Sequence, residues 1–145
     1  MVFVSVTRLR LRGLRWFFGF GIRTWRARAQ LKRAEGFLGG YIGSGGKLTF
    51  WTVSVWRDEA AMKAYRDAGH HQKAMAFLIT GCDEAAVAHW SADEAPSAEE
   101  AAARITTGRL TRLKHPSPAH AAGEHWPDGR LPFFGPISPT STWAP

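Results

Sequence analysis

The stretch from Phe50 to Trp90 constrains the fold of this chain more than any other. A β-rich run, TFWTVSVW, is followed by two segments with helical spacing, RDEAAMKAYRDAG and HHQKAMAFLITG, and then by a second β-rich run, CDEAAVAHW. Strand and helix must pack an apolar side against each other to form a core. The order strand–helix–strand, with two adjacent histidines at the break in the helical part, therefore predicts a small α+β domain with a cavity.

The residues before this stretch predict one more strand and one more helix. Val2 to Leu11 alternate with period two and are rich in β-branched residues, which indicates a first strand that Gly13 ends. From Leu14 the spacing becomes helical, and arginines occupy much of the other side until Gly36 ends the helix. The apolar stripe of this helix consists of Leu14, Phe17, Phe18, Gly21, Ile22 and Trp25. We expect this stripe to cover the sheet.

The full order of elements predicts the fold class. Residues 37–42 form a second strand, residues 43–46 (GSGG) a hairpin connection, and residues 47–56 a third strand. Helices follow over about residues 58–69 and 70–80, and residues 84–90 form a fourth strand. The order β-α-β-β-α-β is the ferredoxin-like, split arrangement, an antiparallel sheet with helices on one face. The other face has no predicted cover, so we expect a homodimer that joins two sheets face to face.

The composition changes after Trp90. We therefore divide the chain into a dimeric α+β barrel domain, residues 1–92, and a C-terminal helix with an extended tail, residues 93–145. Ser97 and Glu100 form a capping box that opens the helix, which runs to about Thr107 or Leu113. Seven of the eight prolines lie beyond His115. Either the tail is disordered, or it wraps the body or a partner subunit through its large aromatics, which are Trp126, Phe133, Phe134 and Trp143.

The chain has a net charge of +7 with its cations concentrated at the N-terminal end. A basic helix with interleaved aromatics could bind nucleic acid or an anionic membrane. That hypothesis is not favoured, because the same aromatics are expected to cover the sheet. No run approaches the roughly 18 apolar residues of a spanning helix, and the single cysteine, Cys82, excludes an internal disulfide. We expect a cytoplasmic protein in which Cys82 is structural.

His70 and His71 are the candidate catalytic residues. Adjacent positions on a helix point about 100° apart, so the two imidazoles cannot face one point. One of them could act as a general base that removes a phenolic or enolic proton, or as a single axial ligand. The alternative is a structural pair at a helix end. Chelation of a metal ion by the pair is not expected, because no carboxylate or histidine follows three or four residues after either of them.

Three aromatic or imidazole side chains and one arginine complete the candidates from the residues themselves. Trp51 and Trp56 lie on opposite pleats of the third strand, so only one can face a pocket on the helix side. His89 lies on the fourth strand, and Arg8 shares the apolar face of the first strand, where a charge requires a partner or an anionic ligand. The alternatives are core packing for Trp51 and Trp56, a structural hydrogen bond for His89, and, for Arg8, a side chain that reaches solvent at the end of the strand.

The strand FWTVSVW, the segment RDEAAMKAYRDAGHH and the strand CDEAAVAHW resemble the dimeric α+β barrel superfamily. This superfamily includes antibiotic-biosynthesis monooxygenases and haem-degrading monooxygenases. Within it, the arrangement is most similar to a domain-of-unknown-function family also described as spheroidene-monooxygenase-like. The resemblance covers residues 1–92 and implies a homodimer with a pocket between sheet and helices. In the haem-degrading relatives a Trp and a His meet the haem, and Tyr65 and Met75 stand at those positions here.

The resemblance implies a monooxygenase-like oxidoreductase that acts on a small hydrophobic molecule, aromatic or polyene-like. His70 or His71 would be the base, and Trp51, Trp56, Tyr65, Met75, Arg8 and His89 would bind the substrate. The cofactor is either none or haem, and haem iron would have to use His70 or His71. The alternative function is non-catalytic binding of a small molecule on the same fold.

Overall fold

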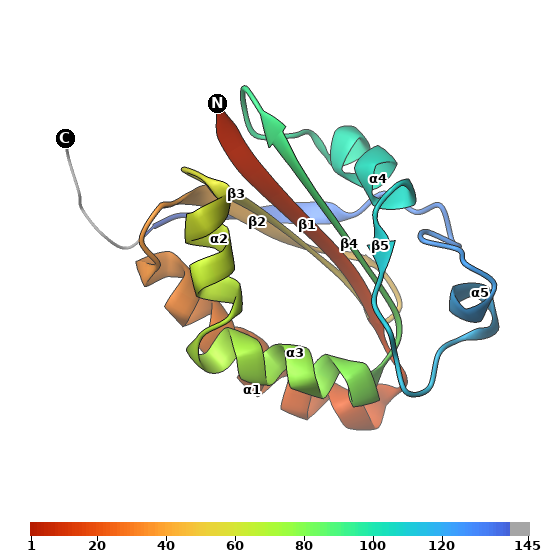
Figure 1. Cartoon of the computed structure of the whole chain (residues 1–145). Helices are drawn as coiled ribbons and strands as arrows, with labels where there is room; N and C mark the ends of the chain where they lie inside the picture. Colours follow the sequence, from red (N-terminus) through yellow and green to blue (C-terminus); the bar gives the residue numbers. More distant parts are fainter. Residues whose placement is uncertain (140–145) are drawn as a thin grey trace.

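The computed structural model describes residues 1–139 as one antiparallel sheet with helices on both of its faces (Figure 1). The strands are β1 (Val2–Leu11), β2 (Phe37–Gly46), β3 (Thr49–Trp56), β4 (Cys82–Ala92), β5 (Arg109–Leu110) and β6 (Phe133–Ile137). The helices are the 3-10 turn η1 (Leu14–Trp16), α1 (Phe17–Arg33), α2 (Glu59–Arg66), α3 (Gly69–Gly81), α4 (Ala98–Thr106) and α5 (Pro118–Ala121). Within residues 1–139, no helix has both the length and the apolar character needed to cross a membrane.

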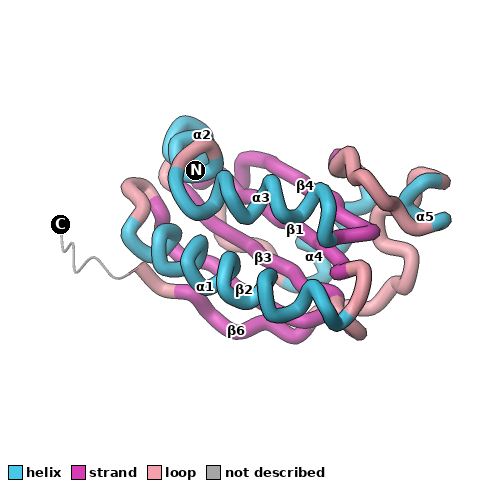
Figure 2. The backbone as a smooth tube through the Cα atoms, turned by 90° about the horizontal axis from the view of Figure 1, so that it is seen from below, coloured by secondary structure: helices cyan, strands magenta, loops and turns pink. Residues whose placement is uncertain are grey.

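The strand order confirms the predicted fold class. The sheet runs β5-β4-β1-β3-β2-β6, and all neighbouring strands are antiparallel. Its inner four strands, β4-β1-β3-β2, have the ferredoxin-like order that the pattern β-α-β-β-α-β predicts. Helices α1, α2 and α3 lie on one face, and α1 and α3 run side by side across it (Figure 2).

Local signals explain where the helices begin. The carboxylate of Asp58 accepts a hydrogen bond from the backbone N–H of Ala61 at 2.8 Å and so caps α2. The hydroxyl of Ser97 accepts from the N–H of Glu100 at 3.1 Å and caps α4, as predicted. Gly69 has a φ of +55° at the start of α3, a backbone conformation that glycine adopts at low cost. The two predicted helices are therefore present, with a bend between them.

The sheet face opposite α1, α2 and α3 is covered within the chain. Val4, Val6 and Trp51 point to this face and pack in one buried cluster with residues of α4, which are Ala101, Ala102 and Ile105. Figure 1 shows α4 and α5 on that side of the sheet. The expectation of an uncovered face was therefore wrong, because helix α4, predicted only as an appendage, supplies the missing layer. The homodimer stays a prediction, but this argument no longer supports it.

Much of the tail belongs to the sheet and its second layer. Strand β6 pairs with β2 from Gly40 to Ser44, Trp126 packs edge-on against Trp51 with ring centroids 6.2 Å apart, and Phe134 packs against Tyr41. The aromatic tail thus wraps the body, although Phe133 is exposed and Trp143 lies outside the described residues. The division of the chain at residue 92 stays a prediction.

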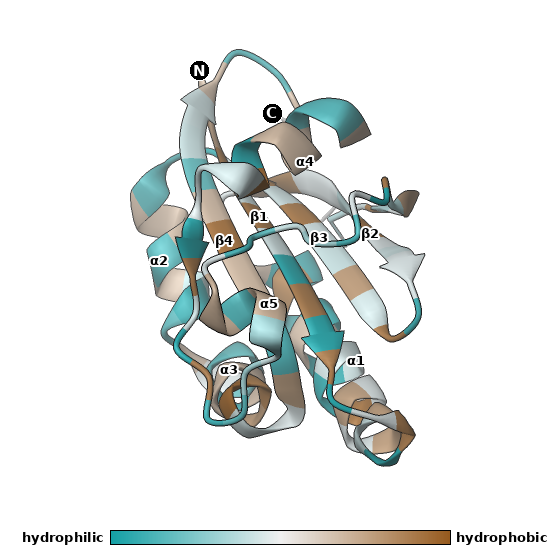
Figure 3. Cartoon of the chain, turned by 90° about the vertical axis from the view of Figure 1, so that its right-hand side faces the viewer, coloured by the Kyte–Doolittle hydropathy of each residue, from teal (hydrophilic) through white to brown (hydrophobic). Residues whose placement is uncertain are grey.

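Two further expectations were wrong. Residues 43–46 are not the hairpin turn, because β2 continues to Gly46 and the chain turns at Lys47 and Leu48. A side chain at Gly45 would collide with the indole of Trp51, which explains a glycine inside this strand. Most of the aromatic stripe of α1 does not cover the sheet: Phe18 and Trp25 are exposed, Phe17 is half-exposed beside Phe50, and Ala27 and Leu31 are the buried residues of this helix. The ribbon of α1 in Figure 3 accordingly alternates hydrophobic and hydrophilic segments.

An ionic cluster fixes the tail to the sheet on the α4 side. Arg8 is 1% exposed, and its guanidinium donates to the Glu84 carboxylate at 2.9 Å. The other oxygen of Glu84 contacts Arg10 at 3.0 Å and accepts from the Ser117 hydroxyl at 3.1 Å. Asp83 holds Arg10 through two bonds of 2.9 and 2.8 Å. Glu84 therefore joins two strands and the tail in one network.

We predict that Glu84→Gln lowers the free energy of unfolding by about 3 kcal/mol, because it leaves the buried Arg8 without its counter-charge. The matched control is Asp83→Asn, which makes the same chemical change at the next, more exposed carboxylate and should cost about 1 kcal/mol or less. Urea unfolding of both variants measures the difference. Equal losses would show that Glu84 has no special place in the network.

Candidate functional site

The helix-facing side of the central strands is partly open, whereas the opposite side is closed. Along β1 and β3, Ser5 pairs with Ser54 and Thr7 with Thr52, and all four share the pleat that faces α1 to α3. Ser5, Thr7 and Thr52 are partly exposed. Val6 and Val53, which pair with each other and point to the opposite face of the sheet, are buried. Solvent thus reaches the middle of the sheet from the helix side. We call this region the sheet–helix site.

Three packed aromatic rings form one wall of the site. Phe3 and Trp56 are cross-strand partners on β1 and β3, and Tyr65 of α2 lies over Trp56 with ring centroids 5.3 Å apart. The indole N–H of Trp56 donates to the hydroxyl of Ser54 at 2.9 Å, and the Tyr65 hydroxyl donates to the carbonyl of Ala27 at 3.0 Å. Burial raises the pKa of Tyr65, so it stays a neutral phenol. The wall is apolar and rigid, with its polar atoms satisfied.

His71 lies next to this wall in a defined tautomer. Its ring centroid is 4.5 Å from that of Tyr65, its backbone N–H donates to the side chain of Gln30 at 3.1 Å, and Nδ1 lies 3.2 Å from the carbonyl oxygen of Arg66. Because a carbonyl only accepts, Nδ1 carries the proton of the neutral ring and Nε2 keeps its lone pair. Burial lowers the pKa of His71. At neutral pH the residue is an uncharged imidazole with one basic nitrogen.

His89 approaches the same site from the sheet. It pairs with Ser5 on β4, it is more exposed than His71, and its ring lies 5.9 Å from that of Phe3. Burial lowers its pKa, and the positive charges of Arg66 and Arg109 lower it further. Both histidines thus favour the neutral form, one on each side of the wall of Phe3, Trp56 and Tyr65.

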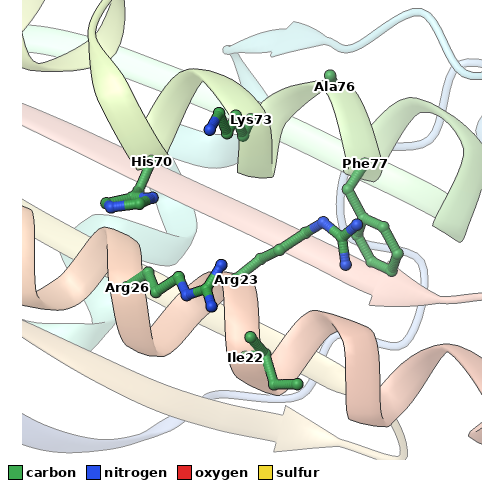
Figure 4. Close-up of a pocket in the computed structure, with 7 residues that line it drawn as sticks. All are labelled: Ile22, Arg23, Arg26, His70, Lys73, Ala76 and Phe77. Carbon is green, nitrogen blue, oxygen red and sulfur yellow. The ribbon is translucent and has the colours of Figure 1, made fainter.

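His70 and Met75 lie elsewhere. His70 is exposed and lines a groove between α1 and α3 together with Arg23, Arg26 and Lys73 (Figure 4). The adjacent histidines therefore face different surroundings, as the 100° step of a helix requires. Met75 also lies on α3, and its side chain is 40% exposed. Neither side chain contributes to the sheet–helix site.

Trp51 and Arg8 point to the opposite face of the sheet. Trp51 is fully buried against Trp126, and Arg8 is neutralised by Glu84, with Asp128 a further 3.6 Å contact. The sequence predicted a partner or an anionic ligand for Arg8, and the partner is a carboxylate of the same chain. The structure brings together His71, His89, Trp56 and Tyr65, and it separates them from Trp51 and Arg8.

Sequence reasoning missed the polar floor of the site. Ser5, Thr7, Thr52 and Ser54 form a patch of hydroxyls on two central strands, where apolar residues are the usual choice. The signal was present, because each strand alternates large apolar residues on one pleat with Ser or Thr on the other. The sequence alone does not show that β1 and β3 are neighbours, so it could not show that the Ser and Thr residues of the two strands lie opposite each other on the same face.

The residues present do not fit a haem. An axial imidazole needs a flat apolar slot on its open side, but His70 faces a groove lined by three cations, and the ring of His71 packs on Tyr65. Among residues 1–139 no group of three His, Cys, Asp or Glu side chains could hold a metal ion. Cys82 is buried, and burial raises its pKa to about 12, so it is an inert thiol at neutral pH.

Comparisons with known proteins find one family model and several solved structures of similar fold. The family model described as antibiotic biosynthesis monooxygenase matches residues 22–76. Among solved structures, Rv0793 from Mycobacterium tuberculosis aligns with a TM-score of 0.59 at 11% identity, over 67% of this chain and 100% of that one. SnoaB, a cofactor-independent oxygenase from Streptomyces nogalater, aligns with a TM-score of 0.51 at 17% identity, over 64% of this chain and 94% of that one.

A conserved protein from Methanosarcina mazei also aligns, with a TM-score of 0.56 at 12% identity, over 62% of this chain and 91% of that one. None of the curated proteins compared with the chain matches it. Identities this low establish the fold alone. The predicted fold is therefore confirmed, and the family match extends over residues 22–76. Membership of the superfamily and the narrower resemblance to the spheroidene-monooxygenase-like family stay predictions.

We predict that His71 makes the stability of the protein depend on pH. Its pKa is lowered in the folded state, so below the ordinary value of about 6.5 the unfolded chain binds a proton that the folded chain does not. The free energy of unfolding therefore falls as the pH drops from about 6.5 to the lowered pKa. Below that pKa, His71 is protonated in both states and causes no further change.

Chemical unfolding of the wild type and of His71→Gln between about pH 7.5 and about pH 5 measures this effect. The wild type should lose more stability than the variant over this interval. NMR titration should place the midpoint of the His71 ring below that of an unfolded peptide. A midpoint at or above it would contradict the neutral, desolvated imidazole.

Proposed function

Because the chain carries an antibiotic biosynthesis monooxygenase match over residues 22–76 and the fold of the dimeric α+β barrel superfamily, we propose that it is a monooxygenase. Its substrate is a small, flat, hydrophobic molecule with a phenolic or enolic oxygen, bound in the sheet–helix site. The observation that carries this proposal is His71: a neutral imidazole beside an aromatic wall, with one nitrogen fixed as a donor and the other free to accept a proton.

The walls of the site match such a substrate. Trp56 is fully buried behind Tyr65, so the partly exposed ring of Tyr65 is the part of this wall that a flat molecule can contact. Across the floor, the hydroxyls of Ser5, Thr7 and Thr52 can donate to or accept from the substrate oxygens. An apolar wall with a few convergent polar groups is the usual composition of a small-molecule site.

The reaction that this arrangement supports needs molecular oxygen and a base. Nε2 of His71 takes the phenolic proton, and the electron-rich ring carbon of the phenolate then reduces O2 and bonds to one of its atoms. The O–O bond breaks, the bound oxygen stays as a carbonyl, and the other oxygen leaves as water with the phenolic proton and the ring hydrogen. A dihydroxynaphthalene would thus give a hydroxyquinone and one water for each O2.

His71 and the oxygen chemistry require no additional group. The proposed cofactor is therefore none, in keeping with the poor fit of His70 and His71 to a haem. The alternative, a non-catalytic binding protein on the same fold, would use the same walls and floor but would not consume oxygen. Measurement of oxygen uptake distinguishes the binding function from the oxygenase.

We predict that His71→Gln lowers the rate of oxygen uptake with dihydroxynaphthalenes by at least about a hundredfold, because the neutral amide of glutamine cannot take the proton. The matched control is His70→Gln, the same change one residue away on the groove side, which should keep the wild-type rate. An oxygen electrode measures both, with thermal unfolding as a check on folding.

A wild-type protein that binds these phenols without consuming oxygen would favour the binding function over the enzyme. Full activity in His71→Gln would remove His71 from the mechanism. The rate should also fall on the acid side, where His71 becomes protonated, and its midpoint should lie below the ordinary histidine pKa of about 6.5.

A further inference from the structure

The outward side of α1 exposes large apolar side chains; Phe17 is half-exposed and also contacts Phe50 of β3, with ring centroids 6.3 Å apart. Phe18 and Trp25 are 78% and 72% exposed, and Phe17 and Ile22 lie beside them along the same helix. They line one shallow hollow with Gly21 and Arg26. The buried side of α1 is formed instead by Phe20, which stacks on Phe50 at 4.8 Å, and by Ala27 and Leu31. We call Phe17, Phe18, Ile22 and Trp25 the α1 patch.

Positive charge surrounds the α1 patch. No acidic residue occurs from Gly13 through Ala34, whereas Arg15, Arg26, Arg28 and Arg33 are exposed along this stretch. None of these four arginines forms a salt bridge with a residue that the structure describes. The helix therefore presents an apolar strip with uncompensated cations beside it.

A cationic groove adjoins the patch. It lies between α1 and α3, has a volume of about 500 Å³, and is lined by Arg23, Arg26, His70 and Lys73, whose side chains Figure 4 shows around it. Ile22 and Arg26 belong both to the groove and to the hollow of the patch. Arg23 is held in place by the ring of Phe77 at 4.5 Å and by the carbonyl of Gly19 at 3.3 Å. No carboxylate lines the groove.

We propose that α1 docks this protein on an anionic phospholipid bilayer. Phe18 and Trp25 enter the boundary between headgroups and acyl chains, and the groove of Arg23, Arg26 and Lys73 receives a lipid phosphate. A helix with an apolar strip, aromatic residues and flanking arginines binds membrane interfaces in this way, and each cation near an anionic surface strengthens the attraction. The objection that these aromatics are needed to cover the sheet does not apply to Phe18 and Trp25, because both are exposed.

Charge decides between the bilayer and a second copy of the chain. A contact of one α1 patch with the same patch of another copy would bring Arg26 and Arg28 of both molecules together without any acidic residue on the helix to offset them. An anionic bilayer instead supplies the opposite charge and an apolar layer at the same time. A free phosphate or a nucleic acid would satisfy the groove but would leave Phe18 and Trp25 in water.

Co-sedimentation of the full chain with vesicles tests the proposal. We expect binding to phosphatidylcholine vesicles that contain roughly one third phosphatidylserine, no binding to pure phosphatidylcholine, and weaker binding as salt rises. Arg26→Glu should weaken binding by about tenfold or more, because it replaces an attraction by a repulsion. Trp25→Ser should weaken it by a similar factor by removing buried apolar area.

The matched control is Arg109→Glu, the same charge reversal at an exposed arginine of β5, which should bind like the wild type. Thermal unfolding shows that each variant is folded. Absence of binding to the anionic vesicles, or equal binding by Arg26→Glu and Arg109→Glu, would overturn the proposal. So would a Trp25-dependent dimer or tight binding to single-stranded RNA in place of vesicle binding. None of these measurements uses turnover, so they stand apart from the oxygenase proposal.

Discussion

The requirement that the apolar face of the central strands opposite α1, α2 and α3 be covered governs this structure. On one face, Val4, Val6 and Trp51 are sealed by α4 and by the aromatic tail, and the buried pair of Arg8 and Glu84 holds the tail in place. An isolated charge in that interior would be costly, so the pair also fixes the register of tail against sheet. The chain thereby completes its own second layer and does not depend on a partner subunit to hide this face.

Because this face is closed, the proposed site lies on the other face of the sheet. There, short hydroxyl side chains occupy positions that a packed core would fill, and α1, α2 and α3 arch over them. His71 gains its properties from its surroundings: the Arg66 carbonyl fixes the tautomer and burial keeps the ring neutral. Packing on one face and openness on the other thus follow from the same alternation along β1 and β3.

The sequence predicted what local patterns determine. A period-two run located β1, short β-rich runs located the other three inner strands, and the side chains of Asp58 and Ser97 marked helix starts that the structure confirms. What failed depended on contacts between distant segments. Periodicity found an apolar strip on α1 but could not show that the sheet would receive Phe20 and Leu31 instead, nor that α4 would return to cover the second face. The floor of Ser5 and Thr52 likewise became visible only once the strands were neighbours in register.

The central claim is that substrate binds on the helix-facing side of the sheet. NMR mapping of the labelled, full-length protein with a dihydroxynaphthalene under nitrogen tests it most directly, because binding is observed without turnover. We predict shifted resonances at His71, Tyr65 and Thr52 and unchanged ones at Ile105 and Trp126. Shifts confined to Ile105 and Trp126, or to the groove beside His70, would contradict the account.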